Sequence, residues 1–190
     1  VVPGDVSLIS VTSPNSITYI SVDDNATGVI ISAHAEDQFG NDAAGAILDW
    51  TAEDWDLPTD DNLGVPSFNV TSSTCNSTGD TSVTFYPDTI AGDNWRVLAS
   101  NNNPTHGLVV DNAPEIIVVP GDVQTLTITS PAVATNVPAG LHKVRVDAVA
   151  IDQYANPVPN AEVTWTYEDW DWPPTDDNAG APFFDVPVND

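Results

Sequence analysis

The stretch Val29–Trp50, which reads VIISAHAEDQFGNDAAGAILDW, decides the fold, and a related stretch, VRVDAVAIDQYANPVPNAEVTW, occupies Val144–Trp165. Every second residue of Val29–Ala35 and of Val144–Ala150 is apolar, whereas the residues between them include the charged Arg145. A period of two residues is typical of a β-strand that buries one face. A slip of one residue would bury the charged positions, so the inward-facing set is well determined.

Other segments of the chain also occur twice. Val1–Val6 returns as Val118–Val123 with the same residues, and Trp50–Val70 returns as Trp165–Val186 with one inserted proline. The offset between the copies stays at 115 to 117 residues, a period that fits a whole domain rather than a solenoid repeat. The sequence therefore predicts two copies of one domain, the second of which stops well short of the period.

Strand patterns dominate both copies, and 16 prolines and 11 glycines interrupt the chain at short intervals. About seven or eight short strands over roughly 115 residues indicate a sandwich of two antiparallel sheets. We predict an all-β protein of tandem β-sandwiches, with a complete domain at 1–119 and a partial one at 120–190. Trp50 and Trp165, each in the third predicted strand of its copy, are the candidate core tryptophans.

The predicted second domain lacks counterparts of three segments of the first copy, Thr81–Pro87, Trp95–Ser100 and Ile116–Val119. A sandwich without these strands leaves part of its core and its strand edges exposed. Either the sequence is a fragment of a longer protein, or another chain supplies the missing strands. Complementation by a second copy would be head-to-tail, and it would propagate into a filament or lattice.

The chain is strongly acidic, with 28 Asp and Glu residues against three Lys and Arg residues and a net charge of −25. This balance argues against nucleic acid and against anionic membrane surfaces, because both need a basic face. No apolar run is long enough to span a membrane, so we expect no membrane insertion of this segment. Self-repulsion at this charge destabilises a compact state, and we expect high salt or divalent cations to offset it.

Two related acidic segments, Glu53–Gly64 and Glu168–Gly180, are candidate calcium sites. Calcium prefers carboxylate and carbonyl oxygens on flexible loops, although the spacing here differs from that of the helix-loop-helix calcium motif. The alternative is an acidic loop that is simply solvated. The candidate calcium ligands are Asp54, Asp56, Asp60 and Asp61 in the first copy and Asp169, Asp171, Asp176 and Asp177 in the second.

The same segments contain Trp55, Trp170 and Trp172. We expect these side chains to pack against the sandwich edge or to anchor a contact with another subunit or a ligand. Tryptophans beside carboxylates also suit a sugar-binding platform, where a ring stacks on the sugar and acids accept hydrogen bonds from its hydroxyls. The expected partners are therefore copies of the same protein, with glycans as the alternative.

Three glycosylation sequons begin at Asn25, Asn69 and Asn76, and they suit an extracellular protein. Cys75 is the single cysteine, so an intrachain disulfide is excluded. The acidity and the sequons together favour the surface of a prokaryotic cell, and they are compatible with an archaeal source.

No pattern in the chain predicts catalysis. The three histidines, His34, His106 and His142, are scattered and lack metal-ligand spacing. There is no nucleophile elbow, phosphate loop or dinucleotide-binding motif. We therefore expect neither enzymatic activity nor an organic cofactor.

Both copies of the Val29–Trp50 stretch resemble the bacterial immunoglobulin-like repeats of invasin and intimin, the Big group 1 type. In that family a strand ends in Asp-x-x-Gly-Asn-Pro-Val-Pro and a second strand follows. The second copy keeps Asn156–Pro159, and the first keeps Gly40–Asn41 but lacks the prolines. The later run Thr81–Ser100 is similar to the paired late strands of the family. The long acidic insertion departs from the family pattern.

The resemblance implies an extracellular immunoglobulin-like sandwich, used as a stalk or adhesive module and without catalytic residues. Together with the repeat and the charge, it predicts a structural protein of a surface filament, sheath, surface layer or adhesin stalk. The alternative prediction is a carbohydrate-binding or host-binding module that uses the loops rich in Trp and Asp.

Overall fold

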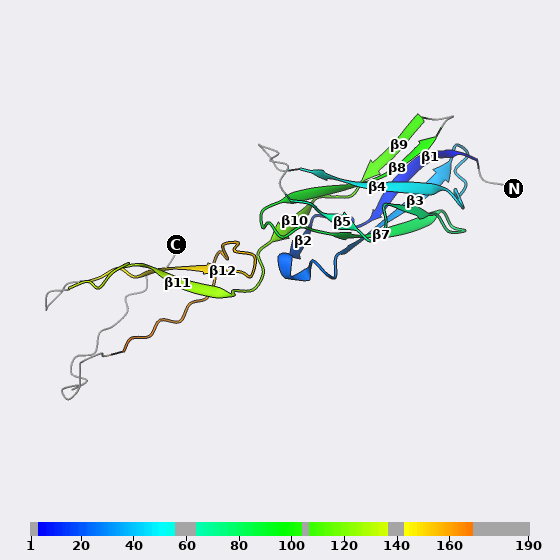
Figure 1. Ribbon diagram of the computed structural model, residues 1–190. Coiled ribbons are helices and arrows are strands. Elements are labelled where there is room, and N and C mark those ends of the chain that lie inside the picture. Colours follow the sequence, from blue (N-terminus) through cyan, green and yellow to red (C-terminus); the bar gives the residue numbers. More distant parts are fainter. Residues whose placement is uncertain (1–3, 56–63, 104–106, 137–142, 169–190) are drawn as a thin grey trace. The chain divides into compact units, whose positions relative to one another are not determined.

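The computed structural model describes residues 4–55, 64–103, 107–136 and 143–168 (Figure 1). The strands are β1 (Val6–Ser13), β2 (Thr18–Ser21), β3 (Val29–Asp37), β4 (Ile47–Asp54), β5 (Ser67–Phe68), β6 (Ser72–Thr74), β7 (Asp80–Tyr86), β8 (Asn94–Asn103), β9 (Gly107–Asn112), β10 (Ile116–Val119), β11 (Thr125–Ser130) and β12 (Asp147–Ile151). A 3₁₀ turn, η1, spans Val22–Asp24. The predicted all-β class is confirmed. Within these ranges, no helix has the length and apolar character that a membrane crossing requires.

Two sheets make up the first repeat. One has the strand order β1-β3-β7-β5, and the other has the order β2-β10-β8-β4-β6, with β9 paired to β8 (Figure 1). The central strand β3 pairs antiparallel with β1 and β7, and β4 pairs antiparallel with β8. Buried side chains of both sheets form one apolar cluster. This arrangement is consistent with a β-sandwich.

The alternation predicted for β3 is confirmed. Ile31, Ala33 and Ala35 are buried, whereas the intervening Ile30 is 63% exposed. Ile31 lies opposite Val83 of β7, which is also buried. A shift of one residue would move these buried apolar side chains to the solvent face of the sheet. The burial pattern therefore fixes the register of this strand.

Aromatic side chains complete the core. Trp50 is 2% exposed, as predicted for a core tryptophan, and its indole N–H donates to the Ser73 hydroxyl at 2.7 Å. Phe85 is fully buried, and its ring meets that of Phe68 edge-on with 5.5 Å between centroids. An edge-to-face contact of this kind suits the aromatic quadrupoles and adds to the gain from burial.

One strand pair departs from the predicted antiparallel arrangement. β10 runs parallel to β2, with Ile116 opposite Thr18 and Val119 opposite Ser21. The same strand pairs antiparallel with β8 on its other side. The sequence pattern did not predict β2, because its four residues are too few to establish a period.

The second repeat has a smaller set of strands. β11 and β12 form an antiparallel pair that is the counterpart of β1 and β3. Apolar side chains of this repeat remain exposed, because the described residues provide no second layer to cover them. They include Leu126 at 49%, Ile128 at 60%, Val144 at 39% and Val146 at 37%.

The third strand predicted for the second copy, from Glu162 to Thr166, is wrong, since residues 161–168 are described and form no strand. Trp165 is only half-buried and is no core tryptophan. In the first repeat the corresponding strand β4 is held by β8 and β6, and the sequence contains no counterpart of β8 in the second copy. By contact, Val1–Pro159 form one compact unit and Asn160–Asp190 another. The domain limits 1–119 and 120–190 remain a prediction from the sequence repeat.

Truncation of Phe85 to alanine tests the importance of this core. Phe85→Ala should lower the free energy of unfolding by about 3–5 kcal/mol, because it removes a buried ring and leaves a cavity. Phe39→Ala is the matched control, since Phe39 is 76% exposed, and it should change stability by less than about 0.5 kcal/mol. Denaturant unfolding of the full chain measures both. Equal effects of the two substitutions would contradict the assignment of the core.

Candidate functional site

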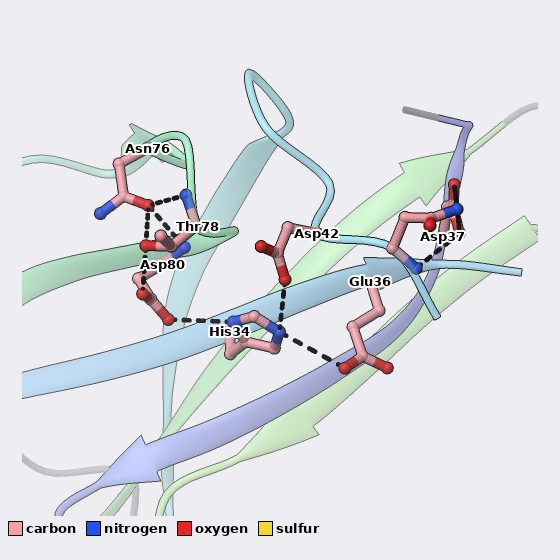
Figure 2. Close-up of polar contacts among 8 residues, drawn as sticks. His34, Glu36, Asp37, Asp42, Asn76, Thr78 and Asp80 are labelled. Atoms are coloured by element: carbon pink, nitrogen blue, oxygen red, sulfur yellow. Dashed lines mark hydrogen bonds and ion pairs between the residues drawn. The ribbon is translucent and has the colours of Figure 1, made fainter. Parts of the chain in front are cut away.

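The carboxylate of Asp37, the last residue of β3, joins the start of the chain to the turn that follows this strand. Its Oδ2 accepts the backbone N–H of Gly4 at 3.0 Å, and its Oδ1 accepts those of Phe39 at 2.8 Å and Asn41 at 3.0 Å. The side-chain amide of Asn41 lies 3.1 Å from both oxygens. These bonds, foremost the one from Gly4, hold the pKa of Asp37 well below its usual range. We call residues 37–41 the Asp37 turn (Figure 2).

The second repeat forms the same turn at residues 152–156, the Asp152 turn. Oδ2 of Asp152 accepts the N–H of Gly121 at 3.0 Å and the side-chain amide of Asn156 at 2.8 Å. Oδ1 accepts the backbone N–H groups of Tyr154 and Asn156, both at 2.9 Å. Burial acts to raise the pKa of Asp152, but the hydrogen bonds from Asn156 and Gly121 outweigh it, so the pKa is lowered.

The second repeat also contacts the first, and we call these contacts the repeat junction. The carboxylate of Asp23, in η1, accepts the backbone N–H of Asp122 and the side-chain amide of Gln153, both at 2.7 Å. Asn25 donates its side-chain amide to the hydroxyl of Tyr154 at 3.3 Å. The Asp152 turn therefore binds the preceding repeat as well as its own first residues.

Asn156 extends the repeat junction to the connection between β7 and β8. Its side-chain amide donates to the carbonyl of Thr89 at 3.0 Å, and its Oδ1 accepts the N–H of Ala91 at 3.1 Å. A Cβ atom at Gly121 would collide with the carboxyl group of Asp23, so glycine is required there. The end of the first repeat that takes part in the junction, called the distal end, comprises Asp23, Asn25 and residues 89–91.

A second polar group surrounds His34 on the outward face of β3 (Figure 2). Nδ1 of His34 lies 2.9 Å from Asp80 Oδ1, and Nε2 lies 3.4 Å from Glu36 Oε1 and 3.6 Å from Asp42 Oδ1. The hydrogen bond to Asp80 is the main cause that raises the pKa of His34. The charges of the three carboxylates add to this effect, and partial burial opposes it. The group therefore favours a protonated imidazolium.

The strand pairing positions these carboxylates. His34 lies opposite Asp80 in the β3–β7 pair, and Glu36 bridges to Asp42 across the turn after β3. The Thr78 hydroxyl lies 2.7 Å from Asp80 Oδ2 and 2.8 Å from Asn76 Oδ1, and its single proton serves one acceptor at a time. The bond from Thr78 is the main cause that lowers the pKa of Asp80, followed by that from His34.

The His34 cluster is a property of the first repeat only. The residues of the second copy that correspond to His34, Glu36 and Asp42 are Val149, Ile151 and Pro157. The cluster is therefore not needed to form the β3-like strand or its turn. Chemically, it offers a proton-binding group enclosed by negative charge.

The acidic segment after β4 is described at its start. Asp54 is the last residue of β4 and lies opposite Trp95 of β8. The backbone N–H of Trp55 donates to the carbonyl of Asn94 at 2.8 Å. The guanidinium of Arg96 lies 3.5 Å from the centre of the Trp55 ring, a cation–π contact that covers one face of the indole. The other predicted calcium and contact residues lie outside the described residues: Asp56, Asp60, Asp61, Asp169, Trp170, Asp171, Trp172, Asp176 and Asp177.

Two buried carboxylates lie where the described chain resumes at Gly64. A Cβ atom at Gly64 would be 2.5 Å from Asp88 Oδ2 and 2.8 Å from Asp93 Oδ2. Asp88 is 8% and Asp93 3% exposed, and Asp88 accepts the Trp95 indole N–H at 2.7 Å and the Ile90 N–H at 2.8 Å. Sequence reasoning missed both acids, because they stand singly between short strands.

Calcium binding remains a prediction. In the described ranges, no group of three or more His, Cys, Asp or Glu side chains is arranged to hold a metal ion. Asp54 is the one predicted ligand that falls inside those ranges. The buried pair Asp88 and Asp93 adds negative charge close to the acidic segment, but it does not by itself define a cation site.

The three predicted sequon asparagines are all described. Asn69 and Asn76 are exposed, whereas Asn25 is half-buried at the repeat junction. Oδ1 of Asn69 accepts the N–H of Thr84 at 2.9 Å, and Oδ1 of Asn76 accepts that of Asp80 at 3.0 Å. A glycan on Asn25 would replace an amide hydrogen next to the Tyr154 hydroxyl.

Comparison with known proteins assigns no family. No protein-family model matches the chain. No curated protein sequence matches it with significance.

The His34 cluster predicts a pH-dependent contribution to stability. Because the pKa of His34 is raised, its contribution is fully present below the unfolded value of about 6.5 and is lost as the pH rises through the folded pKa. An NMR titration of the His34 ring should give a midpoint above that of an unstructured histidine. Asp80→Asn should lower the midpoint, whereas Asp49→Asn, at an exposed site on β4, should leave it unchanged. A midpoint insensitive to Asp80→Asn would refute this account.

The Asp37 turn predicts the opposite pH dependence. Because the pKa of Asp37 is lowered, its contribution is present above the unfolded value of about 3.9 and is lost as the pH falls through the folded pKa. Asp37→Asn should therefore lower the Tm at pH 7, and the difference from wild type should shrink at strongly acidic pH. Thermal unfolding monitored by circular dichroism measures both, with Asp49→Asn as control. A Tm loss at pH 7 no greater than that of the control would show that the carboxylate does not organise the turn.

Proposed function

We propose that this chain is part of an extracellular structural protein, in which immunoglobulin-like repeats follow one another in a surface filament, sheath, surface layer or adhesin stalk. One observation carries the proposal. The Asp152 turn binds the first residues of its own repeat through Gly121 and binds the preceding repeat through Asn156 and Gln153.

This double use of one turn suits a serial array. Linkers rich in Gly or Ser leave successive domains free to reorient, whereas here the residues that join the repeats are engaged in hydrogen bonds. Gly121 and Asp122 both donate their backbone N–H groups to carboxylates, one in each repeat. Hydrogen bonds to charged acceptors are stronger than those between neutral groups. A protein that transmits position or force along its length gains from such connections.

The charge is part of the proposal. At a net charge of −25, neighbouring copies repel one another, and cations would have to lie between them for a lattice or bundle to form. We propose calcium as the cation and the acidic segments after Trp50 and Trp165 as its binding region. An extracellular position also agrees with the sequons at the exposed Asn69 and Asn76.

The alternative, a carbohydrate-binding or host-binding module, has weaker support. It would use Trp55 as a stacking platform, and Arg96 already covers one face of that ring. A sugar could stack only on the other face. Neither proposal assigns an enzymatic activity to the chain.

Cryo-electron microscopy of the native material in calcium, repeated after chelation, tests the proposed function. We expect ordered polymers that loosen or dissociate when calcium is removed, because the acidic copies then repel one another. Separate monomers in both conditions would contradict assembly. Selective binding on a glycan array that is lost in Trp55→Ala would instead favour the alternative.

A further inference from the structure

We propose that the surface formed by Gln38, Phe39 and Asn41, called the Phe39 face, is a docking surface for the distal end of another copy of this domain that precedes it in the same chain. The inference deepens the proposed function and rests on it, since it specifies how repeats would join. The partner is thus a second copy of the same domain, bound head-to-tail.

The Phe39 face has the residue types of the surface that occupies the distal end in this structure. The corresponding residues are Gln38 and Gln153, Phe39 and Tyr154, and Asn41 and Asn156. The backbone also corresponds, because Gly40 and Ala155 occupy the same position with φ values of 74° and 69°. Both turns are held by the same bonds to their aspartates. The two surfaces therefore present their side chains from matching backbones.

The exposure of the Phe39 face is not explained by its own repeat. Phe39 is 76% exposed, whereas Tyr154, which contacts the first repeat, is 38% exposed. Asn41 is exposed, whereas its counterpart Asn156 is half-buried; Gln38 and its counterpart Gln153 are both exposed. The turn uses the backbone N–H of Phe39 and not its ring. An aromatic side chain that projects from a fixed turn gains by docking, because burial removes its apolar surface from water.

The polar groups of the Phe39 face also match the distal end. Asn156, the counterpart of Asn41, makes two kinds of hydrogen bond. It donates to Asp152 of its own turn, and it also bonds Thr89 and Ala91 of the preceding repeat. Asn41 bonds Asp37 through its side-chain amide, and its Oδ1 makes no hydrogen bond within the described residues. This oxygen is available for an N–H donor such as that of residue 91.

The space beside Gly4 also favours docking of a preceding copy. A Cβ atom at Gly121 would collide with the Asp23 carboxyl group across the repeat junction, whereas the three atoms nearest to a Cβ at Gly4 all belong to Asp37 and lie at 3.3 Å or more. Docking would place the Asp23 of a preceding copy beside Gly4, where glycine leaves the room that this carboxylate needs. Phe39 has no hydroxyl, so the docked pair would lack the hydrogen bond that Asn25 makes with Tyr154.

The repeat itself allows a direct test. Because Val1–Val6 and Val118–Val123 are identical, joining residues 1–117 to the full chain 1–190 recreates the sequence of the repeat junction at the new joint. The fusion protein contains an outer Phe39 face at its start and an inner one after the new joint. The substitution Gln38→Cys is made in either copy, which gives an outer and an inner thiol probe. Alkylation of each probe by a maleimide is followed by mass spectrometry of the peptide that contains it. Cys75 is buried and lies in another peptide.

We expect alkylation of the inner probe to be about twofold or more slower than that of the outer probe, because the corresponding Gln153 donates to Asp23 across the repeat junction, although it remains exposed. Phe39→Asp in the inner copy should restore the outer rate. The same substitution in the outer copy should leave the inner rate unchanged. Equal rates for the inner and outer probes would overturn the proposal.

A third thiol probe, introduced by Gln153→Cys at the native repeat junction, separates the two possible failures. If this junction probe is protected while the inner probe is not, the Phe39 face is not a docking surface and the serial array stands. If removal of the partner carboxylate by Asp23→Ala in the preceding repeat leaves the alkylation rate of the junction probe unchanged, the contact on which the proposed function rests is itself absent. Circular dichroism of each variant confirms that the probes report on a folded protein.

Discussion

The hydrogen-bonded carboxylate of Asp37 is the interaction on which the rest of the first repeat depends. It lies at the end of the central strand β3, and the pairing of β1 with β3 begins beside it, with Val6 opposite Asp37. The side chain is 4% exposed, and burying a charge is costly unless hydrogen bonds replace its water. The backbone of Gly4, Phe39 and Asn41 supplies those bonds. One charge therefore fixes the start of the chain, the end of a core strand and the shape of the turn.

The same principle explains how so acidic a chain folds with three basic residues. Arg145 pairs with Asp147 at 2.6 Å on an exposed part of the second repeat, but the buried Asp37, Asp88 and Asp152 accept hydrogen bonds from neutral donors. Asp88 binds an indole and a backbone N–H, and Asp152 binds backbone and amide groups. Oriented dipoles of this kind stabilise a carboxylate without adding an opposite charge. The net charge thus stays available for interactions with cations outside the fold.

Local patterns were sufficient to predict most of the strands, but not the contacts between distant residues. The period of two over Val29–Ala35 gave both the strand and its buried face, and the predicted core position of Trp50 is correct. The role of Asp37 was missed, since its partner Gly4 is 33 residues away, as was the pairing of His34 with Asp80, 46 residues apart. The strand predicted at Trp165 failed for a related reason. A strand needs a neighbour, and a local pattern does not reveal that the neighbour is missing.

The parallel pairing of β2 and β10 has a mechanical consequence. The chain leaves the first repeat directly from the end of β10 at Val119, so tension on that end pulls β10 along its own axis past β2. The bonds from Ile116 to Val119 then share the load in shear, whereas strands that are peeled apart lose their bonds one after another. Separation in shear requires these bonds to break almost together, which raises the barrier to forced unfolding and slows its rate. β2, the strand too short to be recognised in the sequence, therefore adds to the resistance that the pairing of β10 with β8 offers to extension of the domain.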